Sequence, residues 1–206
     1  MLEAFKNGED IHKQAASKVL GIPIEKVTKE ERSNAKAVNF GIVYGISDFG
    51  LAEQLGISRK QAKSYIEQYL EKYNGIDSFM KQIVEKAKED GYVETLFKRR
   101  RYISELKSNN FMIRQFGARA AMNTPIQGTA ADIMKIAMIN LSKRIEKENL
   151  DIKIVLQVHD ELILEVRKED VKKAEELLKS CMEEATSLSI PLEVEISKAN
   201  NWYDCK

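Results

Sequence analysis

Apolar residues recur every three to four positions through most of the chain, the spacing that gathers them on one side of an α-helix. Thr28, followed three residues later by Glu31, has the pattern of a capping box that starts a helix. Gly56 and Ser58 together mark the end of one helix and the start of the next. The pattern therefore predicts helices over about 10–20, 29–44, 48–56, 58–73, 76–90, 109–121, 124–149 and 168–187.

Two β-rich runs, 152–158 and 162–166, are separated by three polar residues and predict a hairpin. Their Ile, Val and Leu content predicts that this hairpin is buried. A last strand is expected over 192–196, after Pro191. The order helix, strand, strand, helix, strand indicates an antiparallel sheet backed by helices, so the predicted fold class is α+β with a helical first half.

Composition and charge limit the kinds of protein that this chain can be. The 206 residues are 43% apolar, enough for one large domain or two small ones, and no apolar run approaches the roughly 18 residues that span a bilayer. Two cysteines without metal-ligand spacing are typical of free thiols in a reducing compartment. The expectation is a cytoplasmic protein with no membrane partner.

Net charge is only +1, but the basic residues are unevenly distributed. Seven of them, against a single acid, lie between Lys98 and Arg119. A local excess of this size suits a phosphate-bearing partner. A solvated basic face is the alternative.

Arg32, Lys36, Phe40 and Tyr44 follow one another at steps of four residues and therefore lie along one slowly winding face of a helix. Two cations four residues apart repel each other, and a bound anion would reverse that repulsion. Positive charge followed by aromatic rings is the order that a nucleoside triphosphate requires. The alternative, which the residue pattern alone favours, is an ordinary amphipathic helix with solvated cations and core aromatics.

Asp160 and Glu161 are adjacent carboxylates between the two β-rich runs. Mg²⁺ prefers oxygen ligands and is often held by one or two carboxylates, waters and substrate phosphates. A solvated turn is the alternative. A two-metal site needs further carboxylates, and Asp132, on a predicted helix, is a weak candidate, so any such site is expected to be incomplete here.

Five segments, in order, carry a resemblance to a known family. They are GEDIH (8–12), RSNAKAVNFGIVYG (32–45), ETLFKRRR (94–101), NTPIQGTAAD (123–132) and QVHDE (157–161). Together they resemble family A DNA polymerases of the bacterial DNA polymerase I type, across essentially the whole chain. The second and last resemble the family's motifs B and C. Lys98 stands where the family usually has glycine.

The resemblance implies a role for each matching residue. The incoming nucleotide would be bound by His12, Arg32, Lys36, Phe40 and Tyr44. Primer–template DNA would be contacted by Arg119, Asn123, Gln127 and His159, and, by charge alone, its backbone would be faced by Arg99, Arg100 and Arg101. Catalysis would use Asp160 as the metal ligand, Glu161 as support, and Lys36 as a general acid that protonates pyrophosphate.

The resemblance also implies an organisation. Residues 1–108 would form the helical fingers, and residues 109–206 a partial palm with the catalytic hairpin at about 152–167. The family's motif A, with the second metal-binding Asp, and the thumb would lie upstream in a missing N-terminal palm and thumb segment. The chain is thus expected to be a C-terminal fragment of a nucleoid-associated polymerase that uses Mg²⁺, dNTP and primer–template DNA, and to be inactive alone.

One alternative from a different class remains open. Residues 51–73 fit a helix-turn-helix with Gly56 at the turn, which would make the chain a non-enzymatic DNA-binding module. Sequence-specific binding to one duplex would favour that module. Indifference to DNA sequence would favour the polymerase.

Overall fold

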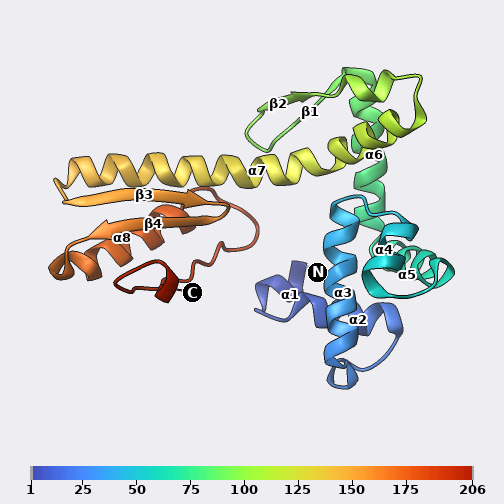
Figure 1. Cartoon of the computed structure of the whole chain (residues 1–206), viewed down its shortest axis with the longest axis horizontal. Coiled ribbons are helices and arrows are strands. Elements are labelled where there is room, and N and C mark those ends of the chain that lie inside the picture. Colours follow the sequence, from blue (N-terminus) through green and yellow to red (C-terminus); the bar gives the residue numbers. More distant parts are fainter. Residues whose placement is uncertain (1, 206) are drawn as a thin grey trace. The chain divides into compact units, whose positions relative to one another are not determined.

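The computed structural model describes residues 2–205, and these divide after Gly128 into two compact units (Figure 1). Helices predominate, and the chain also contains two small antiparallel sheets of two strands each, so the α+β class is confirmed. No helix in this described part combines the length and apolar character of a membrane span. The expected division into fingers and palm at residue 108 is a functional one and stays a prediction.

The first unit is mainly helical. Its elements are α1 (Leu2–Lys6), α2 (Ile11–Leu20), α3 (Lys29–Val43), α4 (Asp48–Leu55), α5 (Arg59–Lys72), α6 (Asn74–Asp90), β1 (Tyr92–Glu94), β2 (Arg100–Tyr102) and the first part of α7 (Phe111–Lys147). The second unit contains the rest of α7, β3 (Ile152–Val158), β4 (Glu161–Val166) and α8 (Val171–Glu183).

Helices α2 to α5 share one core, to which Ala16, Val38, Leu51 and Tyr69 contribute buried side chains. Local signals set most of their ends, because capping residues satisfy backbone amides that the helix itself leaves free. Thr28 and Ser58 each form a complete capping box at the start of α3 and α5.

The division between α5 and α6 differs from the prediction. The predicted ranges left a break at 74–75, but Gly75 lies inside α6, and the chain turns at Tyr73, where φ is −118° and ψ is 53°. Tyr73 is half-buried against the helical core, and its ring lies 4.8 Å from that of Tyr69. Packing of an aromatic residue therefore sets the break. Gly75 inside the helix costs a modest amount of stability, because glycine loses more backbone entropy on folding than other residues do.

A short hairpin of β1 and β2 occupies the segment where the helical pattern fails, with Val93 opposite Arg101. The sequence did not predict these strands because they are only three residues long and carry arginines rather than β-branched residues. Val93 and Ile103 are buried with Ala87 of α6 and Ala121 of α7. The hairpin is thus held by packing against two helices.

Helix α7 is continuous through Pro125, whereas two helices divided near Thr124 were expected. Proline has a φ angle that suits a helix, and its cost comes from the missing amide and from its ring. The Thr124 hydroxyl donates to the Ala120 carbonyl at 2.7 Å and so adds a bond beside the missing one. Ala121 and Ala137, on either side of the proline, are fully buried. Tertiary packing therefore overrides the local break.

In the second unit, β3 and β4 pair in antiparallel register, with a bulge between Ile154 and Leu156. One face of the hairpin packs on α7 and α8, where Leu141, Leu162 and Leu177 form the centre of the core. A sheet backed by helices was predicted. The strand expected over 192–196 is absent, because a strand needs a neighbour and no described strand pairs with this segment.

Lys98 has φ of 66°, a left-handed conformation that costs residues with a Cβ atom about 1–2 kcal/mol. Its ammonium lies 3.7 Å from the Glu94 carboxylate on an exposed surface, where an ion pair contributes little. We expect Lys98→Gly to raise the free energy of unfolding by roughly 0.5–1 kcal/mol, measured by urea denaturation. Lys98→Ala removes the same charge but keeps Cβ, so an equal gain in that control would contradict the explanation.

Candidate functional site

The outward face of α3 carries the cationic and aromatic residues that the sequence singled out. Its inward face is buried through Ala35, Val38 and Ile42. Phe40 and Tyr44 are each 49% exposed, so neither ring is a core aromatic. Large apolar rings left in solvent beside cations indicate a surface that receives a ligand.

Asp10 forms an ion pair with Arg32 that the sequence analysis missed. Asp10 is also the N-cap of α2, where its carboxylate accepts from the amides of His12 and Lys13, both at 3.0 Å. Burial alone would raise the pKa of Asp10, but the hydrogen bonds from Arg32 and the two amides outweigh it, so the pKa is lowered. The carboxylate is therefore charged near neutral pH and competes with any other anion for Arg32.

Lys36 is exposed, and no acidic side chain within residues 2–205 forms an ion pair with it. It lies one helical turn beyond Arg32 on the same face. A cation without a counter-ion is the most accessible point for an incoming phosphate. The two cations of α3 therefore differ, since Arg32 is already engaged and Lys36 is available.

His12 of α2 contacts two residues of α3 and so links the two helices. Its Nδ1 atom is 2.8 Å from the Nδ2 atom of Asn39, and its ring centroid is 5.7 Å from that of Phe40. Burial lowers the pKa of His12, the Asp10 carboxylate raises it, and Arg32 and Lys36 lower it again. The net result is a pKa below the usual value, which favours the neutral ring.

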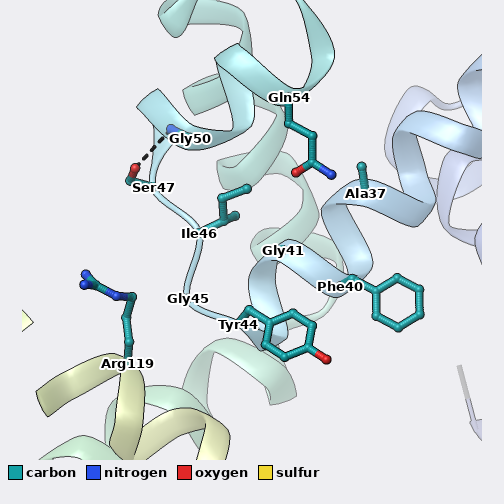
Figure 2. Close-up of a pocket in the computed structure, with 10 residues that line it drawn as sticks. All are labelled: Ala37, Phe40, Gly41, Tyr44, Gly45, Ile46, Ser47, Gly50, Gln54 and Arg119. Atoms are coloured by element: carbon teal, nitrogen blue, oxygen red, sulfur yellow. Dashed lines mark hydrogen bonds between the residues drawn. The ribbon is translucent and has the colours of Figure 1, made fainter. Parts of the chain in front are cut away.

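An open pocket of about 610 Å³ lies at the end of α3 (Figure 2). Figure 2 shows the Tyr44 ring and the Arg119 side chain on the two sides of the Gly45 loop, with Ile46 above them. Gly45 has φ of 68°, and a Cβ atom there would approach Arg119 Cγ to 2.8 Å. Glycine at this position therefore allows the loop to pass close to α7. The residues that line the pocket are Ala37, Phe40, Gly41, Tyr44, Gly45, Ile46, Ser47, Gly50, Gln54 and Arg119.

Arg119, Asn123 and Gln127 follow one another at steps of four residues along α7 and form one stripe. Arg119 and Gln127 are exposed, and Asn123 is half-buried with its Oδ1 atom lacking a hydrogen-bond partner. Arg119 and Gln127 therefore present a guanidinium and an amide to a polar ligand that runs along the helix, with the buried Asn123 acceptor between them.

The three successive arginines each have a partner inside the protein. Arg99 donates to the Gly128 carbonyl at 3.2 Å, and Arg101 donates to the Thr124 hydroxyl at 3.1 Å. Arg100 pairs with Glu94 at 3.0 Å and lies 4.4 Å from the centre of the Tyr92 ring. Two of these guanidinium groups thus tie the β1–β2 hairpin to α7.

The hairpin in the second unit carries His159, Asp160 and Glu161 at an exposed turn. His159 has φ of 52°, and its carbonyl accepts from the Gln157 side chain at 2.6 Å. The prediction of a buried hairpin was wrong toward this end, where Leu156 is 45% exposed. The helices α7 and α8 cover only one face of the two strands, which explains the exposure.

The carboxylates of Asp160 and Glu161 form no ion pair or side-chain hydrogen bond with the described residues. Their oxygens suit Mg²⁺, which needs only one or two protein carboxylates when substrate phosphates and water supply the other ligands. Nowhere in residues 2–205 do three or more acidic, His or Cys side chains gather around a possible ion position. The carboxylates therefore fit part of a metal site.

Helices α4 and α5 form the helix–turn–helix expected over 51–73, and Gly56 has the left-handed conformation at the turn. Leu51 and Ala62 are fully buried in the core that these helices share with α2 and α3. The pair is therefore part of the larger helical unit.

A model of DNA polymerase family A matches residues 1–204 of the chain. DNA polymerase I of Lactococcus lactis is 52% identical over 207 residues, and that of Bacillus subtilis is 50% identical over 206. Both alignments cover 100% of the chain, but only 24% and 23% of the relatives. The chain thus spans about a quarter of the length of these proteins.

Among solved structures, the chain is similar to the polymerase domain of Pol1 from M. smegmatis, in complex with DNA primer-template and dNTP. The TM-score is 0.93 at 43% sequence identity, and the match covers 100% of the chain and 36% of the other. A similarity at this level of identity extends to the family as well as to the fold.

The ion pair of Asp10 with Arg32 predicts that Asp10→Asn strengthens anion binding. Asparagine is an equally good N-cap, so α2 keeps its start while Arg32 loses its competitor. We expect affinity for pyrophosphate, measured by calorimetry, to rise by about 1.5- to fivefold, the equivalent of an exposed ion pair. As pH falls through the lowered pKa of Asp10, its carboxylate is protonated and no longer competes for Arg32. The difference in pyrophosphate affinity between Asp10→Asn and the unmodified chain should then disappear.

Asp48→Asn is the matched control, because it releases Arg59 from an exposed ion pair on α4 and α5. It should leave pyrophosphate affinity unchanged. An equal rise in this variant would mean that general charge, rather than release of Arg32, is responsible.

Proposed function

Since the chain belongs to DNA polymerase family A, we propose that it is the nucleotide-binding and partial catalytic portion of a DNA-directed DNA polymerase in replication and repair. The observation that carries this proposal is the exposed cationic and aromatic face of α3, in a chain that the family model matches almost from end to end. The whole enzyme would transfer a nucleotide from dNTP to a primer 3′-hydroxyl as directed by a template.

In this proposal, the face of α3 binds the incoming nucleotide. Lys36 and Arg32 hold the triphosphate, and His12 adds a hydrogen bond from α2. Phe40 packs against the nucleotide, and Tyr44 against the template base beside the pocket. Support comes from the exposure of both rings and from the lack of an acidic partner for Lys36 in the part of the chain that the structure describes.

The DNA would lie along the stripe on α7. Arg119, Asn123 and Gln127 would contact the minor groove, whose acceptors have nearly the same positions in all base pairs. Such contacts test the geometry of a pair without reading its sequence. His159 would lie at the primer terminus. The Arg99–Arg101 segment would reach the DNA backbone only with groups that its internal contacts leave free.

The reaction would be nucleophilic attack of the primer 3′-oxygen on the α-phosphate, with a new P–O bond formed and the bond to pyrophosphate broken. Lys36 would protonate the leaving pyrophosphate. Asp160, supported by Glu161, would hold Mg²⁺, which when bound stabilises charge on the attacking and leaving oxygens. A complete two-metal site would take a further Asp from the upstream palm segment of the parent protein.

The role proposed for Lys36 predicts that Lys36→Ala weakens binding of a deoxynucleoside triphosphate by roughly tenfold, the typical value of a hydrogen bond to a charged group. The measurement is a calorimetric titration of the 206-residue chain with dATP in the presence of Mg²⁺. Lys88→Ala, an exposed lysine on α6 of the same unit, is the control and should bind as the parent chain does. Equal weakening in both variants would refute a specific site.

The incomplete metal site predicts that the isolated chain does not extend a primer in the presence of dNTP and Mg²⁺. A labelled primer–template with all four dNTPs gives the measurement, and a complete family A polymerase serves as the positive control. Template-dependent extension by the purified chain would show that it needs no further carboxylate.

In the complete polymerase, Asp160→Asn should abolish synthesis but leave affinity for primer–template DNA within about twofold, since one exposed carboxylate contributes little to DNA binding. Primer extension and fluorescence anisotropy measure the two properties. Asp151→Asn, an exposed aspartate before β3, is the matched control that should retain activity. Normal synthesis by the Asp160 variant would remove this residue from the proposed metal site.

A further inference from the structure

Asn39 is a buried polar residue on a face of α3 that is otherwise apolar. It is 8% exposed, while its neighbours Ala35, Val38 and Ile42 are 5% exposed or less. Its Nδ2 atom contacts His12 Nδ1 at 2.8 Å, and its Oδ1 atom is buried without a hydrogen-bond partner in residues 2–205. A buried acceptor without a partner is costly, so the position of this amide requires a compensating role.

The contact with Asn39 determines which nitrogen of His12 carries the proton. The amide NH₂ group only donates hydrogen bonds, and a neutral imidazole has one donor and one acceptor nitrogen. Because Nδ2 faces Nδ1, Nδ1 is the acceptor and the proton lies on Nε2. The Phe40 ring, tilted by 44° against the imidazole, limits rotation of the histidine ring on that side.

A second proton on His12 is disfavoured by its surroundings. Burial and the positive charges of Arg32 and Lys36 lower the pKa of His12, and the Asp10 carboxylate opposes them only in part. These are the charged groups that face the ring from its own helix and from α3. At neutral pH the ring therefore has one N–H group and no charge.

We propose that Asn39 is a positioning residue that fixes His12 as the neutral Nε2–H tautomer, which donates a single hydrogen bond from Nε2 to a phosphate oxygen of the bound nucleotide. The inference rests on the proposed function, because it takes the anion at α3 to be a nucleoside triphosphate. The opposite tautomer would direct a lone pair at the phosphate and repel it. Asn39 thus acts on the nucleotide through His12 without contacting it.

The first test is the tautomer of His12 itself, read from long-range ¹H–¹⁵N correlations of the imidazole nitrogens in the 206-residue chain. The chain has two histidines, so the spectrum of His12→Gln identifies the signals of His12. We expect a protonated Nε2 and a bare Nδ1 above pH 7. A protonated Nδ1 in the unmodified chain would overturn the proposal without any variant having to fold.

The second test replaces the donor by an acceptor of the same shape. In Asn39→Asp, the carboxylate draws a proton to Nδ1, so the Nδ1–H signal should appear and the pKa of His12 should rise. Asn34→Asp adds the same charge to the same helix away from His12, and its His12 signals should match those of the unmodified chain. An unchanged tautomer in Asn39→Asp would overturn the proposal.

Titration with dATP separates this inference from the function on which it rests. At a pH above the raised pKa of His12, where the ring is the neutral Nδ1–H tautomer, Asn39→Asp should bind about tenfold more weakly than Asn34→Asp, a factor typical of a hydrogen bond to a charged group. Equal affinities of these two variants would overturn the positioning role. If the unmodified chain has the expected tautomer but binds no triphosphate, the proposed function fails, while the effect of Asn39 on the His12 ring stands.

Discussion

The close packing of α2 against α3 is the contact on which the candidate nucleotide site depends. Ala15, Ala16 and Ala35 are at most 1% exposed within the shared core. Small side chains at a helix–helix contact permit short distances between the helix axes. This proximity joins His12 to Asn39 across 27 residues of sequence, and Asp10 to Arg32 across 22. Larger residues at the contact would separate both pairs.

That packing places on one surface three hydrogen-bond donors that differ in their charge and in whether a counter-ion is present. Lys36 is charged and has no counter-ion among the described residues, Arg32 is charged but engaged by Asp10, and His12 is a neutral donor. The exposed Phe40 ring then provides an apolar surface on the next turn of the helix. Such a gradient suits a ligand whose negative charge is concentrated at one end. It also keeps the empty surface from accumulating uncompensated positive charge, which would destabilise α3 by repulsion.

The arginine-rich hairpin shows that local charge need not indicate a ligand. Arg99 and Arg101 hold β1–β2 against α7 through a carbonyl and a hydroxyl. The approach is so close that a Cβ atom at Gly128 would meet Thr95 Cγ2 at 2.7 Å. The hairpin therefore supports the part of α7 that carries Arg119, and the basic stretch combines a structural function with whatever charge remains for a partner.

The sequence by itself determined the elements whose signals are local. The α3 helix begins at a capping box that Thr28 completes within one turn, and its cationic and aromatic face follows from the period of the helix. Motif order along the chain determined the family. Tertiary structure alone decided that α7 continues through Pro125, that 192–196 forms no strand, and that Arg32 meets Asp10. Each of these outcomes depends on packing neighbours or hydrogen-bond partners distant in sequence, about which the periodicity of a single segment contains no information.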